Sequence, residues 1–229
     1  MGEDYKRKGM MNQLIKIISN NPDVIRCYIS MKNYNENLYE HSINVAYLSM
    51  VFGSSCYKNL NEITELFIAA ILHDYGKMYI SRSILDKPGM LTVDERKKIE
   101  MHSIMGYIHL KKQTKLSNNI LYGVLDHHEK VDGSGYSQGK KSCEISDYAK
   151  IITIADVYDA MISDRVYRKK FQRDEVSDYI NNNAGNHFDK ELVHKFLNLI
   201  EEIPNLENLE MRLKSMLTEI QQNHYLIFS

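Results

Sequence analysis

Residues 61–77, NEITELFIAAILHDYGK, carry the pattern on which the fold prediction depends. Apolar side chains recur three and four residues apart, as on the buried face of a helix, at Ile63, Leu66, Phe67, Ala70 and Ile71. His73 and Asp74 follow that face directly. The stretch therefore predicts a buried helix that ends in a polar pair able to do chemistry.

Helical spacing of this kind runs through most of the chain. Thr92 and Glu95 form a capping box, Asp189 is a good N-cap, and Pro22 breaks the first helix. Strand-like alternation is nearly absent, and residues 132–139, DGSGYSQG, have the composition of a loop. Helices are predicted over residues 10–18, 38–52, 61–73, 92–112, 117–127, 147–163, 173–183, 189–202 and 206–222.

These elements predict an all-α fold, a single helical bundle with extra N- and C-terminal helices. We expect an N-terminal helical segment over 1–34, a central domain over 35–200 and a C-terminal helix over 201–229. The apolar stripes at both ends are assigned to the core, with the face of a homodimer as the alternative.

Composition excludes several classes of protein. The 229 residues include 29 Lys and Arg against 30 Asp and Glu, so the net charge of −1 excludes a broad nucleic-acid-binding surface. Three scattered cysteines are typical of a reducing compartment. Because no apolar stretch approaches the roughly 20 residues that cross a bilayer, we expect a cytoplasmic protein without a membrane partner.

Imidazoles and carboxylates lie where a helical core is expected. A charged Asp on a buried face is costly unless it is paired or binds a metal. Each residue alone has a structural explanation, but the set suits Fe, Mn, Zn or Ni, since no thiolate is placed to compete. The set comprises His41, the His73-Asp74 pair, His102, the His127-His128 pair and Asp156.

Several motifs occur in one order along the chain. They are YEHSINVAYLS at 39–49, ILHDYGK at 71–77, KPGMLTVDE at 87–95, MHSIMG at 101–106, DHHEKVDGSGY at 126–136, IADVYDAMISDRVYR at 154–168 and HFDKELV at 187–193. With these motifs the chain resembles the HD-GYP phosphodiesterases of the HD metal-dependent phosphohydrolase superfamily, over about residues 35–199.

The resemblance implies a centre of two divalent metal ions. Fe or Mn is expected first, with Zn, Ni and Mg as alternatives. Asp74 would bridge the two ions; His41, His73 and Asp156 would complete one site, and His102, His127 and His128 the other.

The resemblance also implies an activity in signalling, the hydrolysis of a cyclic dinucleotide. Cyclic di-GMP is expected first, cleaved by a metal-bridging hydroxide to linear pGpG and then to GMP. Asp74 and Lys77 would be catalytic. Substrate would be held by Lys77, Gly135, Tyr136, Arg165 and Arg168.

Two positions depart from the family pattern. The Gly-Tyr-Pro signature is here Gly135-Tyr136-Ser137, and Asn37 stands where some members place a glutamate for a third metal, so two metals are expected. Two alternatives stay open: an HD phosphohydrolase acting on another nucleotide, and a signalling module that binds a cyclic dinucleotide without hydrolysing it. His109, His187, His194 and His224 match no ligand position and are predicted to be structural.

Overall fold

The computed structural model describes residues 2–163, 170–202 and 215, with side chains from residue 9 onward. Within these ranges the chain is built from helices, and β structure is limited to two isolated bridges, Asp132 with Lys141 and Ala184 with Phe188. The predicted all-α fold is therefore confirmed. The predicted helix over 206–222 lies outside the described residues, apart from residue 215.

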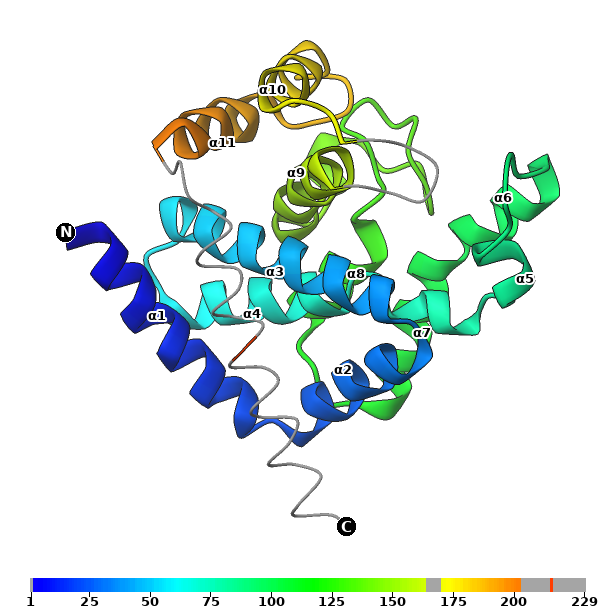
Figure 1. Cartoon of the computed structure of the whole chain (residues 1–229), viewed down its shortest axis with the longest axis horizontal. Coiled ribbons are helices and arrows are strands. Elements are labelled where there is room, and N and C mark those ends of the chain that lie inside the picture. Colours follow the sequence, from blue (N-terminus) through cyan, green and yellow to red (C-terminus); the bar gives the residue numbers. More distant parts are fainter. Residues whose placement is uncertain (1, 164–169, 203–214, 216–229) are drawn as a thin grey trace.

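Helices α3 (Glu36–Cys56) and α4 (Leu60–Leu72) form the centre of the bundle (Figure 1). The Asn35 side chain caps α3 by accepting a hydrogen bond from Leu38 N at 2.9 Å. Gly53 allows the two helices to approach closely, because a Cβ there would lie 2.5 Å from Leu66 Cδ2. Helices α8 (Asn118–Asp126) and α9 (Asp147–Ile162) pack against this pair and complete the core around the polar residues described below.

Two N-terminal helices, α1 (Gly2–Ser19) and α2 (Pro22–Tyr34), cover one side of the centre (Figure 1). The predicted break at Pro22 is confirmed, since Asn21 caps α2 by accepting from Val24 N at 3.2 Å. The sequence prediction did not identify α2 as a separate helix. Its buried face, which includes Cys27 and Met31, joins the main core.

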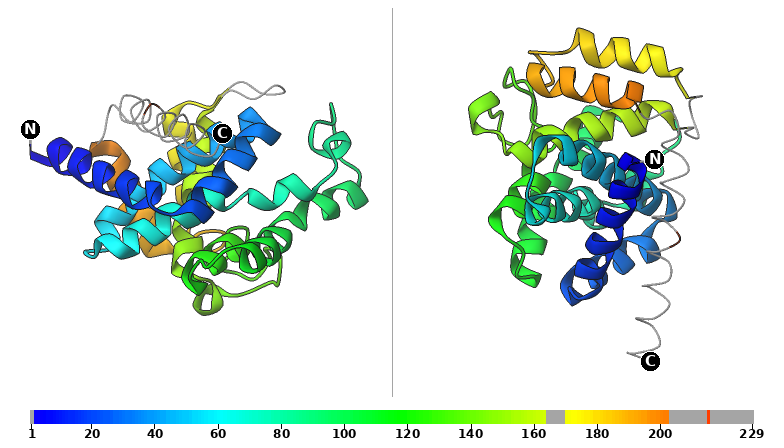
Figure 2. Two further views of the ribbon diagram at one scale, coloured as in Figure 1. Left: turned by 90° about the horizontal axis from the view of Figure 1, so that it is seen from below. Right: turned by 90° about the vertical axis from the view of Figure 1, so that its left-hand side faces the viewer.

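Two further helices, α10 (Arg173–Asn182) and α11 (Lys190–Glu202), lie on the opposite side of the bundle from α2 (Figures 1 and 2). Phe196 packs against Phe52 and Tyr158, with ring centroids 5.2 and 5.3 Å apart. Asp189 caps α11 as predicted, accepting from Leu192 N at 3.1 Å. None of the helices in the described ranges is long and apolar enough to cross a membrane.

Between α4 and α8 the chain leaves the bundle as an arm (Figure 2). The arm contains the 3-10 helix η1 (Tyr75–Tyr79), α5 (Arg82–Leu85) and α6 (Val93–Glu100), and α7 (His102–Gln113) returns to the core. The predicted capping box is confirmed, with Thr92 N donating to Glu95 Oε2 and Glu95 N to Thr92 Oγ1.

The single helix predicted over 92–112 is wrong, because the chain bends at Met101 and divides it into α6 and α7. At this bend η1 packs directly on the start of α7. A Cβ on Gly76 would lie 1.8 Å from His102 O, so only glycine permits the contact. This packing, which joins residues 26 positions apart, explains why local periodicity did not predict the break.

Candidate metal centre

The structure brings together all seven side chains that the sequence analysis singled out as metal ligands. They come from five parts of the fold: His41 from α3, His73 and Asp74 from the end of α4, His102 from the start of α7, His127 and His128 from the end of α8, and Asp156 from α9. His73, Asp74, His102 and His127 are at most 1% exposed.

Asp74 lies between two groups of ligand atoms. Its Oδ2 is 3.4 Å from His73 Nε2 and 3.8 Å from His41 Nε2. Its Oδ1 is 3.3 Å from His102 Nε2 and 3.9 Å from His127 Nε2. Each carboxylate oxygen thus faces a different set of imidazoles.

We call these sets the His41 half and the His102 half. The His41 half comprises His41, His73 and Asp156, whose Oδ1 is 3.0 Å from His41 Nε2. The His102 half comprises His102, His127 and His128; one nitrogen of each lies, with an oxygen of Asp74, within 4.8 Å of the others.

Hydrogen bonds at Nδ1, the ring nitrogen that faces away from Asp74, fix the orientation of the histidine rings. Three imidazoles hold Nδ1 against a backbone carbonyl one helical turn earlier, at 2.7 Å in each case: His73 with Ala70, His102 with Ile99 and His127 with Val124. The Nδ1 atom therefore carries the proton, and the Nε2 lone pair is directed at the other ligands.

His41 is held differently, by a carboxylate. Its Nδ1 lies 2.7 Å from Asp159 Oδ2, and Asn44 Nδ2 donates to the other oxygen of Asp159 at 2.9 Å. Asp159, one turn after Asp156 on α9, is 4% exposed. The sequence analysis missed Asp159; its spacing of three residues from Asp156 within an apolar helix was the available signal.

The two halves differ in charge. In the His102 half, burial lowers the pKa of His102 to about 4 and that of His128 to about 3, and it holds the pKa of His127 well below its usual range. These imidazoles are neutral at pH 7, the form that binds a metal.

Carboxylates determine the charge of the His41 half. Burial alone would lower the pKa of His41, but its hydrogen bonds to Asp156 and Asp159 raise it to about 9. Burial would likewise raise the pKa of Asp74, but the charges of Lys77 and His73 hold it far below its usual range. The centre therefore contains ionised carboxylates in a buried site, which calls for cations.

Two buried atoms at the centre lack any hydrogen-bond partner, Asp74 Oδ1 and His73 Nε2. Buried polar groups in folded proteins are almost always satisfied, so these two need a partner that the chain does not supply. A divalent cation accepts lone pairs from both kinds of atom, and imidazole with carboxylate is a set that transition metals prefer. The residues present therefore fit a metal centre.

Lys77, which the sequence analysis expected to be catalytic, lies beside Asp74. Its Nζ is 2.5 Å from Asp74 Oδ2, and its side chain is 26% exposed while Asp74 is buried. The ammonium group thus stands between the carboxylate and solvent, a place from which a lysine can contact an incoming anion.

The glycine-containing loop borders the centre. The Tyr136 ring lies 4.7 Å from the ring of His128, centroid to centroid. Gly135 is required by close packing, since a Cβ there would lie 2.4 to 2.6 Å from the backbone of residues 128–130, and its contact with substrate stays a prediction. It packs the loop onto its own chain. Glu129 holds the loop by accepting from Gln138 N at 2.6 Å and Lys140 N at 3.0 Å.

Other predicted residues lie away from the centre or outside the described residues. Arg165 and Arg168, which were predicted to hold substrate, lie outside the described residues, as does His224. His109 stacks on Tyr79 with ring centroids 3.6 Å apart, and His187 stacks on Phe188 at 4.1 Å. His194 faces Asn198 on the exposed side of α11.

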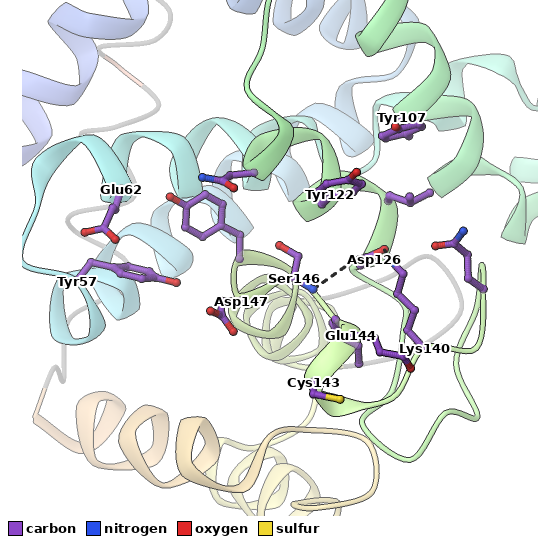
Figure 3. A pocket seen from close by; sticks show the side chains of 15 residues that line it. Tyr57, Glu62, Tyr107, Tyr122, Asp126, Lys140, Cys143, Glu144, Ser146 and Asp147 are labelled. Atoms are coloured by element: carbon purple, nitrogen blue, oxygen red, sulfur yellow. Dashed lines mark hydrogen bonds and ion pairs between the residues drawn. The ribbon is translucent and has the colours of Figure 1, made fainter.

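A separate pocket of about 800 Å³ opens beside α8 and the start of α9 (Figure 3). Tyr57 and Glu62 line one end, Tyr107 and Tyr122 the other. Lys140 crosses it to a bidentate ion pair with Asp126, at 2.8 and 2.9 Å. None of the seven predicted ligands lines this pocket, so its size does not mark the reactive centre.

The chain is similar to known phosphodiesterases. A "Probable cyclic di-GMP phosphodiesterase" of Vibrio cholerae is 42% identical over 142 residues, 59% of this chain and 32% of the relative. A "Cyclic di-GMP phosphodiesterase" of Thermotoga maritima is 34% identical over 176 residues, 75% of this chain and 47% of the relative. The chain thus spans less than half the length of these curated relatives.

A solved structure shares the fold. The crystal structure of a cyclic GMP-AMP specific phosphodiesterase of Vibrio cholerae superposes with a TM-score of 0.58 at 17% identity, covering 85% of this chain and 52% of the other. The sequence profile of the HD domain matches residues 27–192, which include every ligand of both halves. This protein belongs to the HD domain family.

Proposed function

We propose that the chain is a binuclear metal-dependent phosphodiesterase that hydrolyses a cyclic dinucleotide, with cyclic di-GMP as the first substrate and linear pGpG, then GMP, as products. The observation that carries the proposal is the position of Asp74, whose two oxygens face two separate sets of imidazoles. The names of the Vibrio and Thermotoga relatives support the choice of substrate.

The chain's residues would hold two divalent cations, iron or manganese first. Asp74 would be shared, His41, His73 and Asp156 would hold one cation, and the three imidazoles of the His102 half the other. Bound there, the pair would supply Lewis acidity, which makes a water more acidic and neutralises charge on a phosphate.

Neighbouring side chains would bind the substrate and assist the leaving group. Lys77, at the solvent side of Asp74, would donate to a phosphate oxygen or to the leaving oxygen of the ester. Tyr136, beside His128, offers a ring on which a nucleobase can stack. Arg165 and Arg168 would hold a second phosphate bidentately, which suits a substrate with two phosphodiesters.

The test combines metal analysis with product chromatography. Chain loaded with Mn²⁺ or Fe²⁺ should hold two ions and convert cyclic di-GMP to pGpG. Asp74→Asn should lose more than about 100-fold in kcat/KM, since removing even an outer partner of a metal ligand costs 10- to 100-fold. Glu65→Gln, which alters a half-buried carboxylate bonded to Tyr148, is the matched control and should retain activity. Binding of cyclic di-GMP without cleavage, at full metal content, would refute the enzyme and favour a binding module.

A second candidate is a hydrolase of another cyclic dinucleotide. It is favoured by Ser137, which replaces the proline of the family signature beside Tyr136. Parallel digests of cyclic di-GMP, cyclic GMP-AMP and cyclic di-AMP, compared by kcat/KM, separate the two. A preference for either of the last two would assign the chain to this candidate.

A further inference from the structure

Of the four imidazoles whose Nδ1 contact is described at the centre, His41 alone rests on a charged group. His73, His102 and His127 each use the backbone carbonyl three residues earlier in the chain, so their orientation follows from local geometry. His41 depends on Asp159, a residue 118 positions away on another helix. Its position therefore requires α3 and α9 to be correctly packed.

Both carboxylate oxygens of Asp159 are used in hydrogen bonds that hold it against His41. Its Oδ2 faces His41 Nδ1 at 2.7 Å, and its Oδ1 accepts from Asn44 Nδ2 at 2.9 Å and from Ser163 Oγ at 3.3 Å. Its carboxylate is buried and lies behind His41, on the side away from Asp156 and Asp74. Asp159 is thus placed to orient His41, and His41 would contact the cation through Nε2.

We propose that Asp159 is a positioning residue that keeps the proton of His41 on Nδ1 when Nε2 binds a cation, and thereby sustains cation binding in the His41 half, leaving the His102 half unaffected. The inference rests on the proposed metal centre. A carboxylate behind a ligating imidazole fixes its tautomer and increases its basicity, and losing such a partner costs 10- to 100-fold in metal affinity.

The chemistry of an amide makes the role testable by a substitution of equal size. Asp159→Asn leaves one accepting oxygen where the carboxylate uses one for His41 Nδ1–H and the other for Asn44 Nδ2–H and Ser163 Oγ–H. If the amide oxygen stays with Asn44, its NH₂ meets His41 Nδ1 and forces the proton onto Nε2, where it blocks the cation.

A compensating change follows from the same geometry. In Asp159→Asn combined with Asn44→Asp, the new carboxylate at 44 accepts from the amide NH₂ at 159, and the amide oxygen is free to accept from His41 Nδ1–H. The tautomer of His41 is restored without a carboxylate in direct contact with it. Cation affinity should recover to within about 10-fold of wild type, the lower bound for a lost outer partner.

The experiment measures Mn²⁺ bound per chain after equilibrium dialysis at pH 8, with no activity assay. Under conditions that saturate wild type, we expect two ions for wild type, one for Asp159→Asn, one for His102→Ala and none when these two changes are combined. Glu65→Gln, another carboxylate bonded to neighbouring side chains, should keep two ions. Thermal unfolding of each variant without metal reports whether the fold is intact.

Each outcome decides the question. Two ions in Asp159→Asn, or failure of Asn44→Asp to restore the lost ion, would overturn the positioning role even if the variant melts at a lower temperature. One ion in the combined Asp159→Asn and His102→Ala variant would show that the effect does not belong to the His41 half. No ion in wild type would instead refute the proposed metal centre itself, so the two failures are distinguishable.

Discussion

Replacing Gly76 by alanine should disrupt both the fold and the centre. A Cβ at this position would lie 1.8 Å from His102 O, 2.5 Å from Gly106 N and 2.8 Å from His102 C. All three atoms are backbone, so no side chain can rotate away. Since ordinary van der Waals contact begins near 3.4 Å, η1 and the start of α7 would have to separate by more than 1 Å.

The expected cost follows from that displacement. Overpacking a tight interior contact costs about 1–3 kcal/mol and occasionally more, and the clash with backbone places this variant at about 3 kcal/mol or above. In a chain of this size each kcal/mol corresponds to about 2–4 °C, so Tm should fall by about 6–12 °C. A shift of about 1 Å in His102 should also lower kcat by about 100-fold.

Alanine variants of two other glycines should differ from Gly76→Ala in their free energy of unfolding, in a predictable order. Gly106→Ala meets Val124 Cγ1 at 3.1 Å and Gly76 N at 3.2 Å, so its cost should be intermediate. Gly9→Ala, in the interior of α1, meets nothing within 4 Å and should gain about 0.5–1 kcal/mol from helix propensity. Urea unfolding of the three variants gives the order. If Gly76→Ala is within about 0.5 kcal/mol of wild type, the contact between η1 and α7 described here does not exist.

Four further predictions concern the centre and its surroundings. Lys77→Met should keep both metals but lose about 100-fold in kcat, measured with metal content as the control. Chelation should lower Tm by about 5–10 °C, and Mn²⁺ at 100 times its Kd should restore it; no shift would exclude tight binding to the native state. Glu129→Gln should cost about 1–3 kcal/mol in urea unfolding, because Gln138 N and Lys140 N donate to different carboxylate oxygens and one of these becomes a donating NH₂. Burial and the charge of Lys130 lower the pKa of His187 to about 4, below its unfolded value near 6.5, so the unfolded state binds the extra proton and metal-free stability should fall from pH 6.5 to 4. His187→Asn should make that fall shallower, and an unchanged slope would contradict the assignment.

Much of the centre could be predicted because its ligands conflict with their local surroundings. His73 and Asp74 follow an apolar helix face, and Asp156 interrupts another, so each stands out against helical periodicity. The pairing of the residues into two halves required the resemblance to a family, since spacing along the chain does not say which imidazole faces which oxygen of Asp74.

The residues that were missed act through long-range contacts. Asp159 resembles an ordinary helix acid until His41, on α3, is seen against it. The bend at Met101 lies where Gly76 packs on His102, and no window of helical periodicity includes both residues. The sequence analysis gave Glu129 no role, whereas its buried carboxylate binds the backbone of the glycine-containing loop. In each case the deciding partner is distant in sequence or requires backbone geometry.

Because its ligands come from α3, α4, α7, α8 and α9, the centre exists only when all five helices are in place. No single hairpin or fragment of the bundle carries both halves. Cations bound there would therefore stabilise the whole bundle, and amide hydrogen exchange should slow together in α3 and α9, helices that are more than 90 residues apart in the chain. Occupancy of the centre would then report complete folding, since any state that has released one of these helices can no longer hold the pair of ions.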